Sequence, residues 1–558
     1  MRAALPRRLA ATLGVLAGFA HYATHAHHPG GAHVAPGLGW DESMHLAQPA
    51  ARLALHLQQA DIGGFFDALL DCAQYPPLAP LATGLFEGFF GVSEELARFL
   101  GSLWLALAVV GAIRAGELLA GWRAGLVAGA VVALSPLASS YAGTLFLEVP
   151  FLAVCTWALA RVLAHQPHND PQAPWFLPTG LLVAALPFTK WNYGLLAAGA
   201  LWLALLAKER HGSSFGRARR LALLFGPGLF LMAWWFVLPL PEGAERAREH
   251  REALLGFLGG NTGLAATPWT LRALYAGCEL FARPSSAVCA LVLVFLALGA
   301  KGGAPCWWLA AALVPTIAAH PFHLDRFQLA WLAPLAPLAG AGFEAAWSRG
   351  RWASLALLLP FVLPGAAWER GRLAQSLGLL SSDPAVREHQ LATLESRANR
   401  WSGRVAPTAG LPLEQQRQVA AAIAAAAGAD ARIGWIGVSS ELSPGALNLL
   451  LLDEGRSDER FLAAAQETID LDYYGAAREV GDEELRRHCE RFDVIVWSEP
   501  IDVKERADRA WLAPVAARVP ALLPGAWLGA DGVLARFEVE RPLRQPTSVT
   551  IRGWRLQR

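Results

Sequence analysis

Long apolar stretches separated by short polar turns fill the first two thirds of the chain. A bilayer core about 30 Å thick is crossed by a helix of about 20 mostly apolar residues. By this criterion the pattern predicts about eleven membrane-spanning helices, at 8–24, 99–119, 123–140, 145–163, 175–189, 191–207, 221–240, 286–300, 304–319, 327–347 and 352–368. The helices at 175–189 and 191–207 are expected to be tilted or partly re-entrant and to meet at Lys190.

Charged residues are distributed unevenly over the 558 residues, and this divides the chain in two. Asp, Glu, Lys and Arg make up about 12% of residues 1–370 and about 26% of residues 371–558, and the second share is typical of a soluble domain. We therefore predict a polytopic α-helical transmembrane domain over 1–370 and one soluble domain over 371–558. The net charge of +1 and the lack of a basic block argue against a nucleic-acid-binding protein.

The second part alternates short β-type runs with helical stretches. The runs at 432–438 and 492–497 are rich in β-branched and aromatic residues, and helical patterns cover 412–427, 458–467 and 482–490. Such alternation is typical of a small α/β layer structure. The six cysteines show no CxxC pair, so neither a disulfide framework nor a cysteine-based zinc site is predicted.

Arg and Lys in the short loops predict the orientation of the chain in the membrane. The amino terminus, with three arginines in its first eight residues, is expected in the cytoplasm. Counting alternate loops then places the first long loop, 25–98, and the soluble domain 371–558 on the extracytoplasmic face. The segment 8–24 is interpreted as an uncleaved helix, although a cleaved signal peptide would leave the same loop outside.

The first outer loop carries an acidic pair followed by an amphipathic stretch. Asp41 and Glu42 are adjacent, and the apolar residues of 46–59 recur at helical spacing, which fits a helix lying in the membrane interface. A rigid turn follows at Tyr75, which precedes two prolines. Adjacent acids in a loop are usually solvated, so spacing alone assigns this pair no function.

Polar residues near apolar helices need a stronger explanation. Glu148 is expected about one turn inside a spanning helix, where a carboxylate is costly unless it faces a partner or a wet cavity. It is either a salt-bridged structural carboxylate or a functional one. Lys190, one of four lysines, is either a snorkelling anchor or a cation beside an anionic ligand. A third cluster, which includes His320 and Arg326, stands at a later helix entrance.

The loop count places Asp41, Glu148, Lys190 and Arg326 on one side of the membrane. Two acids and two cations at one interface are suited to an anionic lipid and to a nucleophile that needs a base.

The order of these motifs resembles the GT-C superfamily of polytopic glycosyltransferases. The resemblance is nearest to its protein-mannosyltransferase-like branch, which includes bacterial lipid A aminoarabinose transferases, and covers about residues 35–350. The motifs that carry it are Asp41-Glu42, the Tyr75-Pro76-Pro77-Leu78 turn, Gly91-Val92-Ser93-Glu94 with Arg98, Tyr141 before Glu148, Thr189-Lys190, and Arg326-Phe327 before Leu335 and Pro337. This sequence departs from the family at three points, with Tyr75 for the usual His, Glu148 for the frequent Asp, and Phe327 for the frequent Tyr.

The resemblance implies transfer of a sugar from a polyprenyl-phosphate donor to a lipid, glycan or protein acceptor on the extracytoplasmic face of a bacterial inner membrane. Inversion at the anomeric carbon needs a base, for which Asp41 is the candidate, with Glu42 or Glu148 assisting.

The resemblance further implies that Lys190 and Arg326 stabilise the departing lipid phosphate. Trp191, Tyr141 and Tyr75 are candidates to stack on the sugar or line the lipid entry, and Asn192 and His320 are further candidates to line the substrate site. No cofactor is required by the sequence. A divalent cation held by Asp41 and Glu148 is the candidate metal site.

A transporter or flippase with a similar number of helices is the alternative. It predicts inverted repeats and polar residues at the membrane midplane, whereas the halves of this chain show no convincing repeat and its polar residues gather at one face.

Overall fold

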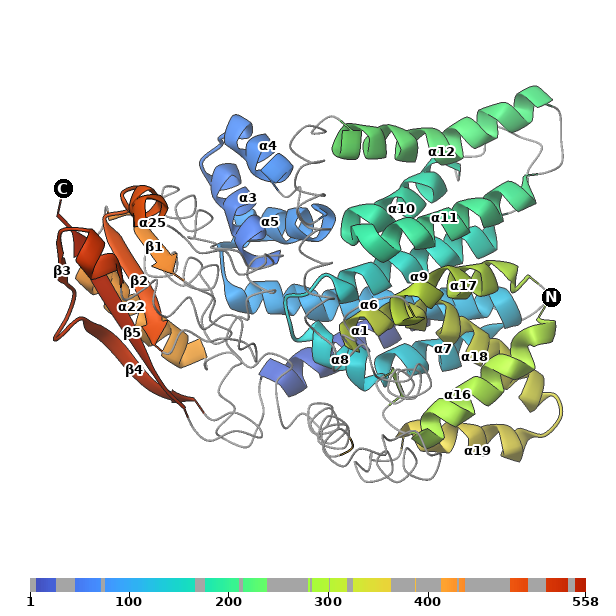
Figure 1. The fold of residues 1–558 in the computed structure, drawn as a ribbon. Helices are drawn as coiled ribbons and strands as arrows, with labels where there is room; N and C mark the ends of the chain where they lie inside the picture. Colours follow the sequence, from blue (N-terminus) through green and yellow to red (C-terminus); the bar gives the residue numbers. More distant parts are fainter. Residues whose placement is uncertain are drawn as a thin grey trace.

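A bundle of helices and a separate mixed sheet make up the computed structural model (Figure 1). The structure describes residues 7–26, 46–71, 76–165, 176–209, 214–237, 280–281, 284–300, 302–318, 325–362, 387, 413–428, 431–436, 482–499, 518–539 and 547–557. The sheet lies at one end of the bundle, which includes α3 (Gln48–Gln58), α4 (Ile62–Asp71) and α5 (Leu78–Phe90). The predicted boundary at residue 370 lies outside the described residues.

Each of the predicted apolar segments overlaps a helix of the bundle. The remaining elements are α1 (Arg7–Ala26), α6 (Glu94–Ala120), α7 (Trp122–Ala133), α8 (Pro136–Ala142), α9 (Glu148–Ala164), α10 (Phe176–Thr189), α11 (Trp191–Lys208), α12 (Ser214–Val237), α16 (Pro284–Leu296), η3 (Ala297–Gly299), α17 (Ala304–Ala318), η4 (Asp325–Trp331), α18 (Leu332–Trp347) and α19 (Arg351–Val362). Among the described helices, two segments are by themselves long and apolar enough to cross a bilayer, Leu96–Ala120 and Gln328–Trp347. Seven further apolar helices are shorter.

The predicted single helix at 123–140 is wrong, because the chain breaks between α7 and α8. Ser135 accepts a hydrogen bond from the Ala138 backbone N–H and so caps a new helix. Pro136 takes the first helical position, where its missing N–H costs nothing. The prediction for Glu148 also needs correction, since this residue is the first of α9 rather than one turn inside it.

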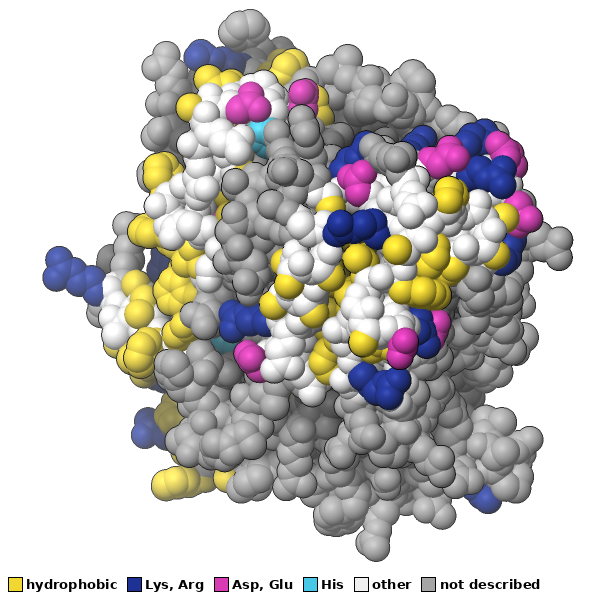
Figure 2. Space-filling model, turned by 90° about the vertical axis from the view of Figure 1, so that its left-hand side faces the viewer, with side chains coloured by type: hydrophobic (Ala, Val, Ile, Leu, Met, Phe, Trp, Pro, Cys, Tyr) yellow, Lys and Arg dark blue, Asp and Glu magenta, His cyan; other side chains and the backbone are white. Residues whose placement is uncertain are grey.

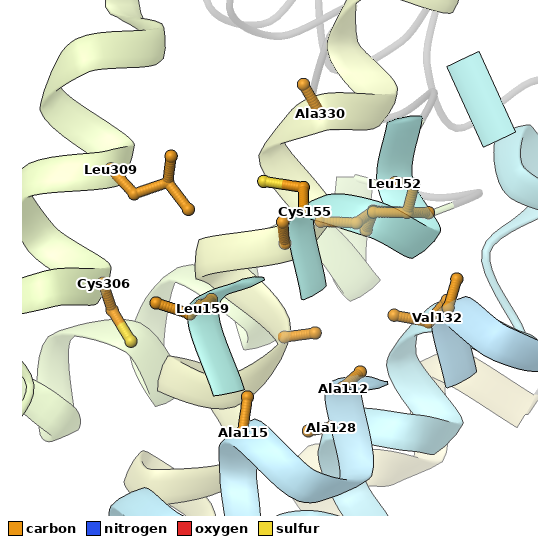
Figure 3. Packing of buried hydrophobic residues seen from close by; sticks show 14 of the residues in the cluster. Ala112, Ala115, Ala128, Val132, Leu152, Cys155, Leu159, Cys306, Leu309 and Ala330 are labelled. Carbon is orange, nitrogen blue, oxygen red and sulfur yellow. The ribbon is translucent and has the colours of Figure 1, made fainter. Parts of the chain in front are cut away.

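Small residues bring the helix backbones close together. A Cβ atom at Gly342 of α18 would stand 1.7 Å from the carbonyl oxygen of Leu293 on α16, and one at Gly340 would stand 2.1 Å from that of Ala124 on α7. Figure 3 shows how Ala112 and other small or branched residues of α6, α7 and α9 fill the core between these helices. Close approach of this kind is how helices associate where lipid tails provide no hydrophobic driving force.

A buried ionic cluster ties α9, α11 and α12 together. The Glu209 carboxylate lies 2.7 Å from the His165 Nε2 atom and 2.7 Å from the Arg220 Nε atom, and its side chain is fully buried. The Lys208 ammonium donates to the carbonyl oxygens of Val162, at 2.6 Å, and of His165, at 3.0 Å. The last turn of α9 is thus held by its neighbours.

We expect Glu209→Gln to destabilise the protein strongly. The substitution keeps the size of the side chain but removes the carboxylate that neutralises the buried Arg220, a change that typically costs about 3–5 kcal/mol. Thermal unfolding in detergent measures the effect. The exposed Glu483–Arg486 pair, at 3.0 Å, supplies the control, because Glu483→Gln should change stability by less than about 1 kcal/mol. Equal stability of the two variants would contradict a role for the cluster.

The sheet has five described strands with helices on both faces. Its strands are β1 (Ile433–Ile436), β2 (Val494–Glu499), β3 (Gly525–Trp527), β4 (Val533–Val539) and β5 (Thr547–Leu556). β1 and β2 pair in parallel, β5 pairs antiparallel with β2 on one side, and β3 and β4 pair antiparallel with β5. The strands predicted at 432–438 and 492–497 are confirmed as β1 and β2.

Alternate residues of β2 pack on opposite faces, as strand geometry requires. Val494 and Val496 lie in a cluster with α22 (Leu413–Ala427), whereas Ile495 and Trp497 lie in a cluster with α25 (Asp482–Cys489). Burial raises the pKa of the Cys489 thiol to about 12, so this cysteine packs as a neutral side chain. The predicted helices at 412–427 and 482–490 are confirmed, and 458–467 lies outside the described residues.

Figure 2 shows the side of the molecule that lies on the left in Figure 1, and charged and hydrophobic side chains are mixed there. Lys and Arg side chains, Asp and Glu side chains and hydrophobic ones are interspersed over the described part of this surface. Trp527 of β3 is 43% exposed, and the Arg552 guanidinium lies 5.8 Å from the centre of its ring.

Candidate functional site

Glu148 and Lys190 form a buried ion pair. The Lys190 Nζ atom lies 3.0 Å from the Glu148 Oε1 atom, and the two side chains are 6% and 0% exposed. They are 42 residues apart in the sequence, so the fold alone brings them together. Two opposite charges are tolerated at this depth because each neutralises the other.

Both residues stand at the start of helices. Glu148 is in the first turn of α9, where the helix dipole favours a negative charge. Lys190 is the extended N-cap residue between α10 and α11, with φ −154° and ψ 107°. The two helices can meet there because Gly194 has no Cβ. A Cβ atom added at this position would stand 2.5 Å from the Leu186 carbonyl oxygen. The prediction that these helices meet at Lys190 is confirmed.

Aromatic pairs continue the contact between α9 and α11. Phe151 and Tyr193, each three residues beyond a member of the ion pair, pack edge to face with ring centroids 4.7 Å apart. Tyr141, a predicted lining residue, is buried on α8 and packs edge to face on Phe146 at 5.4 Å. Sequence reasoning missed Tyr193, although its helical spacing from Lys190 was a usable signal.

The 3-10 helix η4, which carries Arg326, packs against α8, α9, α17 and α18. Its backbone is thus next to the helices that carry Tyr141 and Glu148. The side chain of Arg326 lies outside the described atoms, as do those of Trp191 and Asn192 at the start of α11. Their roles remain predictions, and so do those of Asp41, Glu42, Tyr75 and His320, which lie outside the described residues.

The predicted interfacial helix at 46–59 corresponds to α3, which packs against the region of the ion pair. Ala47 and Ala51 share a buried apolar cluster with Leu147, the neighbour of Glu148. Leu53 shares another with Phe188, two residues before Lys190. α3 therefore packs in clusters that include sequence neighbours of both charged residues.

Sequence reasoning missed α4 and the turn that joins it to α3. The Asp61 carboxylate accepts hydrogen bonds from the Gly64 backbone N–H and from His56 Nδ1, both at 3.0 Å. These hydrogen bonds hold the pKa of Asp61 below its usual value, and the one from the Gly64 N–H has the larger effect. This arrangement fixes where α4 begins.

A metal site is not formed by the described residues alone, among which no three His, Cys, Asp or Glu side chains gather. The candidate cation ligand Asp41 lies outside them, so the predicted divalent cation stays a prediction. The other candidate ligand, Glu148, has the Lys190 ammonium as its immediate neighbour.

The arrangement of the chain matches solved structures of glycosyltransferases. Neither the known family models nor the curated protein sequences contain a match. The chain is similar to ArnT from Cupriavidus metallidurans bound to undecaprenyl phosphate, with 16% identity and a TM-score of 0.55 over 97% of each chain.

Two larger proteins share the fold as well. The apo oligosaccharyltransferase of Archaeoglobus fulgidus shows 11% identity and a TM-score of 0.50 over 92% of this chain and 72% of its own. The mycobacterial arabinofuranosyltransferase AftD shows 17% identity and a TM-score of 0.50 over 99% of this chain and 42% of its own. The chain therefore has the fold of the GT-C glycosyltransferases, in an arrangement that resembles ArnT over nearly its full length.

Proposed function

We propose that this protein is a membrane glycosyltransferase that moves a sugar from a polyprenyl-phosphate donor to an acceptor on the extracytoplasmic face, with inversion. The observation that carries the proposal is the buried Glu148–Lys190 pair, set at the starts of α9 and α11, whose neighbours Leu147 and Phe188 pack in clusters with α3. A buried lysine at the outer end of a helical bundle is suited to a lipid phosphate, and the likeness to ArnT bound to undecaprenyl phosphate supports such a donor.

The reaction forms one bond to the anomeric carbon, breaks another and transfers one proton. The acceptor hydroxyl oxygen attacks the anomeric carbon while the bond from this carbon to the phosphate oxygen breaks. Asp41 takes the proton from the hydroxyl as general base, with Glu42 assisting. The polyprenyl phosphate departs with the electron pair of the broken bond and so gains negative charge.

Lys190 and Arg326 stabilise the charge on the departing phosphate. Glu148 acts through Lys190, since its carboxylate holds the ammonium in place at 3.0 Å and is not available as an unneutralised base. Tyr141 and Trp191 border the sugar, and Tyr75, Asn192 and His320 complete the lining.

The orientation proposed here places the amino terminus in the cytoplasm of a bacterium and the sheet domain outside its inner membrane. The two ends of the chain lie at opposite ends of the molecule (Figure 1), which fits an odd number of crossings before the sheet domain. The site and the sheet domain then share the extracytoplasmic side.

Transfer of label tests the proposal. Membranes that contain the protein, incubated with a set of labelled polyprenyl-phosphate sugars, should move label from one of these lipids to another membrane fraction. Membranes without the protein should leave it on the carrier. If expression is normal and no donor in the set loses label, the proposed function is wrong.

A further inference from the structure

Gln48, the first residue of α3, is a buried amide that the proposed mechanism does not use. The residue is 1% exposed, and its Nε2 atom makes no hydrogen bond to any residue in the described part of the chain. Buried polar groups are almost always paired, because an unsatisfied donor loses its water without replacement. A donor kept in this condition indicates a hydrogen-bond acceptor that the protein itself does not supply.

The first turn of α3 does not form a free helix start. Leu46 and Ala47 before it are themselves helical, in a π turn, and Ala47 has helical angles of φ −65° and ψ −50°. The turn contains no acidic residue that would repel an anion. What it offers an outside acceptor is therefore the Nε2 donor of Gln48, which is unpaired within the described part of the chain.

The same turn packs in a cluster that includes a neighbour of the buried ion pair. Ala47, immediately before Gln48, and Ala51, one turn after it, belong to the apolar cluster that includes Leu147, the neighbour of Glu148. Gln48 thus lies in a segment that packs with the neighbour of Glu148, the carboxylate that pairs with the Lys190 ammonium.

We propose that the Gln48 amide binds the phosphate of the polyprenyl-phosphate carrier. It donates one N–H to a phosphate oxygen whose charge Lys190 balances. This inference rests on the proposed function and adds to it a phosphate-binding residue that was not apparent from the sequence.

Gln48→Met tests the assignment, because methionine has nearly the same length but no donor. The purified variant is titrated with undecaprenyl phosphate and, separately, with undecaprenol, which has the same lipid chain and no phosphate. Thermal stabilisation is the readout. Loss of one hydrogen bond to a charged group should weaken undecaprenyl phosphate binding about 10-fold or more, leave undecaprenol unchanged, and leave the ligand-free protein at least as stable as wild type.

Gln58→Met at the other end of α3 is the matched control. The Gln58 amide donates to the Glu87 carbonyl oxygen at 3.2 Å, so this variant should lose some stability and keep its affinity for undecaprenyl phosphate. The inference is wrong, and the proposed function is unaffected, if Gln48→Met binds undecaprenyl phosphate as tightly as wild type. The same holds if the ligand-free variant unfolds at a much lower temperature than wild type. Wild type that binds undecaprenyl phosphate no better than undecaprenol overturns the inference together with the proposed donor.

Discussion

Lys190→Met should nearly abolish sugar transfer and also destabilise the protein. Removal of one group that stabilises charge in a transition state typically lowers kcat about 10²–10³-fold. The same change leaves the Glu148 carboxylate buried without its ammonium, 3.0 Å away in the wild type, which typically costs about 3–5 kcal/mol. Transfer rates and thermal unfolding of the purified variant measure the two effects.

The double variant Lys190→Met/Glu148→Gln separates function from folding. With both charges gone, no charge of the pair remains buried, so we expect stability to return close to that of wild type. Activity should stay as low as in Lys190→Met, because the cation at the phosphate is still missing. A double variant that regains both stability and activity would show that the pair is structural only.

Asp41→Asn should reduce transfer by about 10²–10⁴-fold, because the amide cannot accept the proton of the acceptor hydroxyl. Insertion into the membrane and affinity for the lipid donor should not change, since the substitution preserves shape. Activity is measured at saturating donor so that kcat is compared directly. Asp67→Asn, at an exposed acid of α4, is the control and should remain fully active.

Retained activity in Asp41→Asn would rule out the base assignment while leaving the donor assignment intact. In that case Glu42 becomes the base to test, because it is the adjacent acid.

Apolar length and loop charge were enough to predict most of the bundle helices and to place Glu148 and Lys190 on one side. These signals are local, since each helix buries its own stretch of apolar residues and each loop carries its own arginines. The direct contact between the two charges could not be predicted, because it depends on how α9 packs against the junction of α10 and α11. Charged residues are rare in this part of the chain, so both residues stand out in the sequence. Nothing in the sequence indicates that they form an ion pair with each other.

The contacts that sequence reasoning missed join residues far apart in the chain or depend on single backbone details. Glu209 pairs with His165 across 44 positions, and no pattern around either residue indicates the other. The break between α7 and α8 lies at Ser135-Pro136, a cap and first-turn pair within a mostly apolar stretch whose length alone predicted one helix. Gln48 stood in a predicted amphipathic helix as an ordinary polar position, and only its burial sets it apart.

Transfer by the purified protein in liposomes shows whether the protein moves sugar from a lipid carrier and whether Lys190 is needed. Wild type and Lys190→Met are reconstituted at equal density with a labelled undecaprenyl-phosphate sugar and a membrane extract as the source of acceptor, and the label remaining on the lipid carrier is followed over time. We expect wild type to remove label and release undecaprenyl phosphate, and Lys190→Met to leave the label on the carrier. Wild type that never removes label from any sugar donor would contradict the proposed function, and Lys190→Met that removes it at the wild-type rate would contradict the role of Lys190.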